Sequence, residues 1–173
     1  MKVASLKFSV KEKPPFYDVE IDDEGNVKYY NEKGQPHRLD GPAVEYADGA
    51  KHWYVDGKRH RRGGPAIECP NGFNEWWVNN KRHRLDGPAV IWPDGEKEWY
   101  VNDKRHRLNG PAIERANGAK IWYQNDKCHR LDGPAIIWDD GSKEWFVNDK
   151  FIGSSEEGFT DEDFERWKRE HGL

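Results

Sequence analysis

Histidine and arginine recur along this chain at a fixed interval, and both residue types can bind anions. The histidines follow one another at steps of 23 residues: His37, His60, His83, His106 and His129. Arginines flank them in the runs Arg59-His60-Arg61-Arg62, Arg82-His83-Arg84 and Arg105-His106-Arg107. Because arginine forks grip phosphate and carboxylate groups, this basic margin is a candidate site for an anion or an acidic partner.

The spacing argues against catalysis or a shared metal ion. If each unit adds two strands to a sheet, equivalent residues lie about 10 Å apart. Two imidazoles that share zinc need nitrogen–metal distances of about 2.0–2.1 Å. No serine or cysteine recurs as a nucleophile, and no glycine loop of the phosphate-cradling kind occurs. We therefore expect no enzyme activity, no metal and no cofactor, and we expect the histidines to pack within the loops.

These residues belong to a unit of 23 residues, such as His83 to Arg105, which the chain repeats about five times. Gly-Pro-Ala recurs without insertion or deletion at Gly41, Gly64, Gly87, Gly110 and Gly133. A tryptophan column follows at Trp53, Trp76, Trp99, Trp122 and Trp145, and an aromatic column stands directly after it at Tyr54, Trp77, Tyr100, Tyr123 and Phe146. Such self-similarity predicts an array in which each unit contacts its neighbours.

Composition favours a thin sheet over a compact core. Hydrophobic residues make up 35% of the chain and charged residues another 35%, yet there are nine Trp, seven Tyr and seven Phe. Large rings and long charged stems can cover a single sheet. A net charge of −4 argues against nonspecific nucleic-acid binding. No apolar run reaches the length of a signal peptide or membrane span, so we expect a cytoplasmic protein. Cys69 and Cys128 stand in different columns, which favours unpaired thiols.

The chain divides into three expected regions. Residues 1–36 form N-terminal capping strands, at 6–10, 16–21 and 27–30. Residues 37–153 form five 23-residue β-hairpin repeats. Residues 154–173 form a linker and a helix at 160–170, with Thr160 as N-cap and Asp163 as its capping partner. The helix either covers the open edge of the last hairpin or binds a partner, and open sheet edges permit self-association.

The expected fold is all-β, a single-layer, twisted meander of antiparallel hairpins with one C-terminal α-helix. In each unit, strands at 89–92 and 98–101 flank Pro93-Asp94-Gly95. A two-residue tip at Asp94-Gly95 would pair Val90 with Trp99. The Val90 column would then share an apolar face with the tryptophans, and the columns of Tyr100, Ile91 and Glu98 would share the other face.

A second turn follows each of these hairpins. Asp56-Gly57 is a strong type I′ signal, and Asn102-Asp103 is a weaker version of it. The sequence leaves open whether the Arg-His-Arg segments that come next are strands or loops.

The pattern Tyr-Val-Asp-Gly-Lys-Arg-His, at Tyr54 to His60, combined with Pro-Asp-Gly and an aromatic pair, resembles MORN repeats. It is closest to the variant form in bacterial and phage proteins, some of them antitoxin-like. The resemblance covers roughly residues 23–153. It implies a single-layer hairpin meander that binds proteins or membrane lipids.

Two departures from the family pattern matter. His-Arg-Leu-Asp precedes Gly-Pro-Ala and enlarges one loop, and the turn glycine is replaced in Asn80, Asp103, Asp126 and Asp149. Ligand contacts of the family therefore do not transfer residue by residue.

Two sets of residues are candidates for binding. The basic set either grips an anion or pairs with aspartates of its own loops, and it comprises Arg59, Arg61, Arg62, Arg82, Arg84, Arg105 and Arg107. Its second copy has Gly63 where three other units have Asp40, Asp86 and Asp132, which leaves Arg61 and Arg62 least neutralised. The aromatic set comprises the Tyr100 column, which either packs across strands or forms a recognition surface, and Trp92 and Trp138, which break the type of their own column.

We expect a non-enzymatic module that binds another protein as an inhibitor or adaptor, antitoxin-like or phage-encoded. A second hypothesis is sequestration of a nucleotide or another phosphorylated small molecule by the arginine loops and aromatic rings. A third, by family analogy alone, is binding to anionic lipid.

Overall fold

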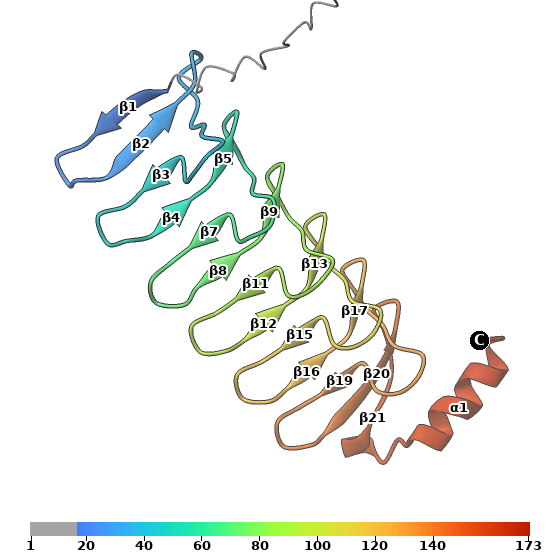
Figure 1. Ribbon diagram of the computed structural model, residues 1–173. Helices are drawn as coiled ribbons and strands as arrows, with labels where there is room; N and C mark the ends of the chain where they lie inside the picture. The colour runs from blue at the N-terminus through green and yellow to red at the C-terminus, as the bar shows by residue number, and fades with distance from the viewer. Residues whose placement is uncertain (1–16) are drawn as a thin grey trace, which may run out of the picture.

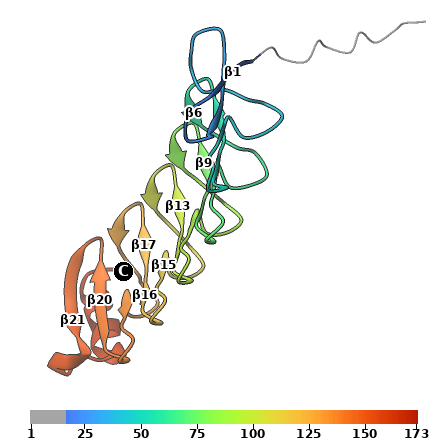
Figure 2. The ribbon, with the colours of Figure 1, turned by 90° about the vertical axis from the view of Figure 1, so that its left-hand side faces the viewer.

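The computed structural model describes residues 17–173, so the strand expected at 6–10 lies outside the described part. The chain forms one long antiparallel sheet of 13 strands with a row of small hairpins along one margin (Figure 1). The expected all-β hairpin meander with one C-terminal helix is confirmed. Figure 2 shows the small hairpins stacked one per unit beside the main sheet.

The main sheet begins with β1 (Asp18–Ile21) and β2 (Val27–Tyr30), and each unit then adds two strands. These strands are β3 (Val44–Glu45), β4 (Lys51–His52), β7 (Ile67–Glu68), β8 (Asn74–Glu75), β11 (Val90–Ile91), β12 (Lys97–Glu98), β15 (Ile113–Glu114), β16 (Lys120–Ile121), β19 (Ile136–Ile137), β20 (Lys143–Val147) and β21 (Lys150–Ser154).

The marginal hairpins hold two short strands each. They are β5 (Tyr54–Val55) with β6 (Lys58–Arg59), β9 (Trp77–Val78) with β10 (Lys81–Arg82), β13 (Tyr100–Val101) with β14 (Lys104–Arg105), and β17 (Tyr123–Gln124) with β18 (Lys127–Cys128). The Arg-His-Arg segments are therefore part strand and part loop. Arg105 ends β14, whereas His106 and Arg107 lie in the loop that follows.

The first four tryptophans of the Trp column mark the corner where the chain leaves the main sheet, whereas Trp145 lies within β20. The Trp99 amide donates to the carbonyl of Ala112 in the next unit at 2.8 Å. The Trp99 carbonyl accepts from the His106 amide of its own hairpin at 3.1 Å. Trp53, Trp76 and Trp122 make the same pair of bonds. One residue thus joins the main sheet, the marginal hairpin and the neighbouring unit.

The expected register of the main hairpins is wrong by one residue. Val90 pairs with Glu98, not Trp99. The turn holds three residues, because the Trp92 amide donates to the Glu96 carbonyl at 2.9 Å and Gly95 adopts the left-handed conformation at φ 94°. Three-residue hairpin loops use such a left-handed residue. A slip of one residue moves side chains to the opposite face.

The two faces are therefore composed differently from the expectation. The Val90 column shares a face with Glu98 and Tyr100, and we call this the tyrosine face. The tryptophan column lies on the opposite face, the tryptophan face, together with the column of Ile91. Five alanines of Gly-Pro-Ala are completely buried, at Ala43, Ala66, Ala89, Ala112 and Ala135.

The second turn of each unit is of type I′, as expected. Both central residues have positive φ, for example 54° at Asn102 and 65° at Asp103. The Asp103 amide donates to the Arg82 carbonyl at 2.9 Å, and its carboxylate accepts from the Arg82 amide at 2.8 Å. Asn80, Asp126 and Asp149 repeat the carboxylate or amide contact with the preceding unit. These side chains explain why most copies lack glycine at this position.

The histidine column links neighbouring marginal hairpins. Nδ1 of His83 accepts from the Asn102 amide at 3.3 Å, and the same bond recurs at His37, His60, His106 and His129. Nδ1 can accept only while it carries no proton. The histidines therefore pack against the next turn, as expected from their spacing.

The C-terminal segment caps the last unit. The short 3₁₀ helix η1 (Ser155–Glu157) leads to α1 (Asp161–Glu170), which lies beside β20 and β21 (Figure 1). Thr160 and Asp163 form the expected capping box. Of the helices within residues 17–173, none has the length and apolarity to cross a bilayer.

Asp103 both accepts a hydrogen bond from the Arg82 amide and adopts a positive φ, and two substitutions separate these roles. We expect Asp103→Ala to destabilise more than Asp103→Gly by about 1 kcal/mol, because both lose the bond to Arg82 but only alanine resists positive φ. Urea unfolding of the full chain measures both values. Equal losses for the two variants would contradict a conformational role, and Lys104→Ala serves as an exposed control.

Candidate binding grooves on the tryptophan face

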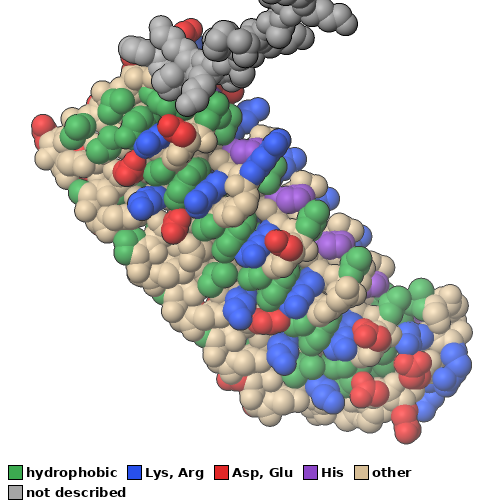
Figure 3. Space-filling view, in the orientation of Figure 1, with side chains coloured by type: hydrophobic (Ala, Val, Ile, Leu, Met, Phe, Trp, Pro, Cys, Tyr) green, Lys and Arg blue, Asp and Glu red, His purple; other side chains and the backbone are tan. Residues whose placement is uncertain are grey.

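An arginine covers each tryptophan of this face except the last. The guanidinium carbon lies 3.6 Å from the ring centroid of Trp53 in the case of Arg61, and 3.8 Å from that of Trp99 in the case of Arg107. Arg84 on Trp76 and Arg130 on Trp122 stack at 4.1 Å. Such stacking is favourable for a flat cation over an aromatic ring. Lysine and arginine side chains accordingly form a band among apolar groups along this face (Figure 3).

The same arginines close their own loops. Arg107 donates to the carbonyl of Pro111 at 2.9 Å and to the carboxylate of Glu114 at 2.7 Å. Arg84 donates to Pro88 at 3.1 Å and to Asp86 at 2.8 Å. A Cβ on Gly87 would stand 2.8 Å from the Arg84 guanidinium carbon, which accounts for glycine before proline in this loop. Arg61, Arg84 and Arg107 are thus bound internally.

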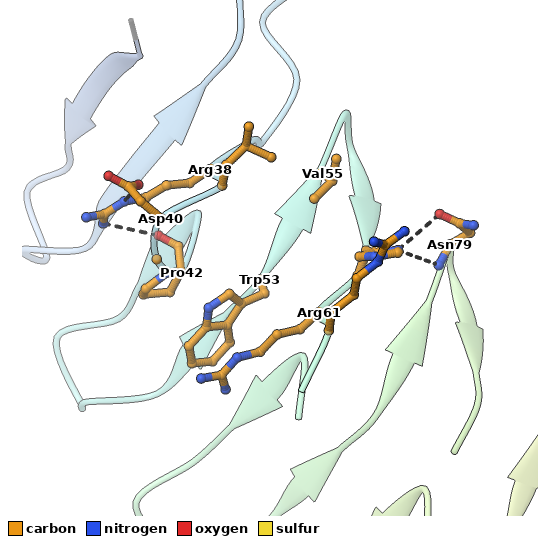
Figure 4. Close-up of a pocket in the computed structure, with 11 residues that line it drawn as sticks. Arg38, Asp40, Pro42, Trp53, Val55, Arg61 and Asn79 are labelled. Atoms are coloured by element: carbon orange, nitrogen blue, oxygen red, sulfur yellow. Dashed lines mark hydrogen bonds and ion pairs between the residues drawn. The ribbon is translucent and has the colours of Figure 1, made fainter. Parts of the chain in front are cut away.

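Open grooves lie between consecutive loops of the tryptophan face. The first groove has a volume of ≈ 770 Å³ and a floor of Trp53, Val55 and His60. Its walls are the loop Arg38–Pro42 on one side and Arg61 and Arg62 on the other (Figure 4). The middle groove, of ≈ 670 Å³, repeats this lining in a later unit. Its floor is Trp99, Val101 and His106, and its walls carry Leu85 and Leu108.

A column of leucines projects from these loops into solvent. Leu39, Leu85 and Leu108 are 65%, 79% and 69% exposed. Their spacing matches the unit, with Arg62 in the place of leucine in the second copy. Exposed apolar side chains around a partly apolar groove are typical of interaction surfaces. The column was visible in the sequence as a regular spacing but was not among the predicted site residues.

In the last unit, the equivalent groove is filled by the protein's own helix. Trp145 and Val147 form its floor and are 1% and 7% exposed. Phe164 and Trp167 of α1 pack on this floor together with Phe159, whose ring centroid lies 5.2 Å from that of Trp145. The wall residue Leu131 is only 38% exposed, and its carbonyl accepts from Lys168 of α1 at 2.8 Å.

Residues that break the repeat make room for the helix. Gly153 stands where other units have the stacked arginine, and Ile152 stands where they have histidine. A Cβ on Gly153 would collide with the ring of Phe159. Phe159 therefore packs on Trp145 in the place where an arginine stacks on each of the other tryptophans. The helix covers the tryptophan face of the last hairpin.

The remaining predicted arginines lie on the tyrosine face or at a loop tip. Arg59 lies over Trp77, Arg82 over Tyr100, and Arg105 between Tyr100 and Tyr123, at 4.4–5.8 Å from the ring centroids. Arg62 is exposed at the wall of the first groove and makes no ion pair with residues 17–173. The predicted basic margin is thus divided between two faces, and Arg62 is its uncommitted cation.

Three predicted residues meet around a buried carboxylate on the tyrosine face. Glu98 accepts from the Tyr100 hydroxyl at 2.8 Å, from the Trp92 indole at 3.1 Å and from Arg105 at 3.3 Å. Trp138 makes the equivalent bond to Glu144 at 2.8 Å. The atypical tryptophans Trp92 and Trp138 thus serve the glutamates of their own units.

The environment of Glu98 determines its protonation. Burial opposes ionisation, but the hydrogen bonds from Tyr100 and Trp92 and the charge of Arg105 outweigh it, so the pKa of Glu98 is lowered. Burial and the contact with Glu98 raise the pKa of Tyr100 to about 12. Both groups therefore hold one charge state near neutral pH. This arrangement is a structural network, since each hydrogen bond that the Glu98 carboxylate accepts comes from a neighbouring side chain.

The two cysteines are unpaired, as expected. Burial raises the pKa of Cys128 to about 12, which keeps its thiol protonated at neutral pH. Among residues 17–173, no group of three histidine, cysteine or acidic side chains is arranged to hold a metal ion.

Comparisons with known proteins found no matching family model and no matching curated protein. The repeated antiparallel hairpins are compatible with a MORN-like repeat.

Glu98 should make stability sensitive to acid. Because its folded pKa lies below the ordinary value of 4.5, its contribution is present above that pH and is lost as the pH falls below it. We expect Glu98→Ala to lower the free energy of unfolding at pH 7 by about 2–3 kcal/mol, since three donors lose their acceptor. Glu98→Gln should lose less and should flatten the acid dependence below pH 4.5.

The control for this experiment is Glu114→Gln, which breaks a partly exposed pair with Arg107 and should cost less than about 1 kcal/mol. Chemical denaturation at several pH values measures all four proteins. An unchanged acid dependence in Glu98→Gln would show that other carboxylates carry it.

Gly153→Ala should release α1 while the array stays folded. The added methyl group displaces Phe159 from Trp145, so the helix loses its first anchor. We expect faster amide exchange in residues 161–170 and higher exposure of the Trp145 ring, with little change in units one to four. Gly141→Ala is the control, because it strains an exposed turn with positive φ but should leave α1 bound. Unchanged exchange in α1 would contradict this role of Gly153.

Proposed function

We propose that this protein is a non-enzymatic, MORN-like repeat module that binds another protein through the tryptophan face. The module acts on this partner as an inhibitor, as antitoxin-like proteins do, or as an adaptor. The observation that carries this proposal is the pair of open grooves whose equivalent, in the last unit, is filled by α1. A groove that buries aromatic side chains within the chain offers the same chemistry to a partner.

The location of the arginines favours a protein partner over a phosphorylated small molecule. Arg61, Arg84 and Arg107 already stack on tryptophan and bond to loop carbonyls. A phosphate would have to compete with these contacts. The leucines beside them, by contrast, present apolar surface that only a macromolecule or lipid would cover. Sequestration of a nucleotide and binding of anionic lipid stay predictions.

The proposal is tested by photo-crosslinking from the groove walls. A benzoylphenylalanine at Leu39 or Leu85, in the full-length protein within its native cells, should give a discrete adduct with a single partner protein. The same probe at Ile21, which is 70% exposed at the end of the edge strand β1 and lines neither groove, is the control. No protein adduct from either groove position, or an equal adduct from Ile21, would overturn the proposal.

Leu85→Glu should weaken binding of the captured partner without unfolding the array. The side chain is 79% exposed, so its replacement removes apolar contact but no core packing. We expect an affinity loss of about tenfold, which corresponds to 1.4 kcal/mol. Titration calorimetry with the purified partner measures this loss, and unchanged affinity in both Leu85→Glu and Leu39→Glu would place the interface elsewhere.

A further inference from the structure

The last groove of the array shows what kind of segment fits such a groove. Its occupant is a ten-residue amphipathic helix. Phe164 and Trp167 lie three positions apart on one helix face, with ring centroids 6.0 Å apart and ring planes nearly parallel. Residues three apart share a face of an α-helix. Their rings cover Trp145 and Val147, and Lys168 fixes the helix to the wall through the Leu131 carbonyl.

The first groove presents the same floor without a helix. Four units earlier along the chain, Trp53 and Val55 take the places of Trp145 and Val147, and Leu39 takes the place of Leu131. Leu39 is 65% exposed where Leu131 is 38% exposed, because α1 covers only the latter wall. The first groove is therefore a repeat of a site whose occupied form is present in the same molecule.

Three substitutions distinguish the two grooves and specify a different occupant. His60 replaces Ile152, Arg61 replaces Gly153, and Arg62 replaces Ser154. The Arg61 guanidinium lies on Trp53 where the Phe159 ring lies on Trp145. An occupant of the first groove therefore needs no counterpart of Phe159.

Charge supplies the remaining specificity. Arg62 stands exposed on the wall and pairs with no acidic side chain of residues 17–173, while Arg38 and Arg61 have their own carboxylates at 2.9 Å and 3.2 Å. In the last groove, the Leu131 carbonyl accepts from Lys168, and Ser154 stands in the place of Arg62. An unpaired guanidinium instead favours a carboxylate, which it can bind through two parallel hydrogen bonds.

We propose that the first groove receives an amphipathic helix of the partner protein, with two large aromatic or aliphatic side chains one turn apart and an aspartate or glutamate facing Arg62. The inference rests on the proposed function and names the chemistry of its partner. The apolar pair covers Trp53 and Val55 beside Leu39. The acidic residue fixes the direction of the helix across the groove.

The test uses a fluorescent, hydrocarbon-stapled peptide of residues 160–173 as the probe, because this segment carries both the aromatic pair and an acidic first turn but not Phe159. Anisotropy titrations with the full-length protein should show saturable binding. Leu39→Glu and Arg62→Glu should each weaken it by about tenfold, through lost apolar contact and charge reversal. A peptide with Phe164→Ala and Trp167→Ala should not bind.

Leu85→Glu is the matched control, since it makes the same substitution in the middle groove. It should change peptide affinity less than about twofold. Absence of saturable binding, unchanged affinity in both Leu39→Glu and Arg62→Glu, or an equal loss in Leu85→Glu would overturn the assignment. Binding of the probe that persists without its aromatic pair would equally overturn it.

The outcome is separable from that of the proposed function. If crosslinking from Leu39 or Leu85 captures a partner but the peptide neither binds nor competes with it, the helical occupant is wrong and the protein-binding function stands. If neither position captures a protein, the function itself is wrong. Vesicles of anionic lipid that protect Leu39 from crosslinking would assign the groove to a membrane surface and overturn the helix.

Discussion

The structure depends on how the backbone of each corner tryptophan is bonded. Its amide bonds to the next unit and its carbonyl to its own marginal hairpin, so two sheets and two units meet at one residue. The stacked arginine shields this corner from water and simultaneously closes the loop that leads to Gly-Pro-Ala. Removing either partner would leave buried backbone groups exposed to competition from solvent. The recurrence of both residues at the four corners, from Trp53 to Trp122, follows from this shared role.

A chain this polar folds because its polar groups bond between units. The histidine ring and the turn aspartate each bond to the next or the previous hairpin, and the arginine stacks on the tryptophan of the previous hairpin. The apolar core is correspondingly thin, a row of alanines and β-branched residues with aromatic rings on both faces. Stability is therefore distributed along the array as nearest-neighbour contacts.

Much of the fold could be predicted from the spacing of residues. The repeat step predicted hairpins at a constant interval, Asp56-Gly57 and Asn102-Asp103 predicted type I′ turns, and Thr160 with Asp163 predicted the start of the helix. The register could not be predicted correctly, because Asp94-Gly95 suits a two-residue tip as well as a three-residue loop. Only the pairing of Trp92 with Glu96 distinguishes them. Because of this one-residue difference, Val90 pairs with Glu98 instead of Trp99, and the valine and tryptophan columns lie on opposite faces.

The candidate site was harder to predict than the fold. Arg61 and Arg62 are neighbours in sequence, yet one is bound to Trp53 and the other is free toward residues 17–173. The spacing of residues in the sequence does not distinguish the bound arginine from the free one. Trp92 looked functional because it breaks its column, but it serves Glu98. The grooves arise from loops of adjacent units, so they are not present in any one copy of the motif.

The bonds between units have one more consequence. The bonds of the histidines and of the turn residues join positions a constant 19 or 21 apart, and those of the corner tryptophans join positions 13 apart. Deleting or duplicating one whole unit inside the array would therefore return every donor to an equivalent acceptor, while Gly153 and α1 would still close the end. Recombination between repeats can therefore add or remove one groove at a time, and the new junction between units requires no new side chain.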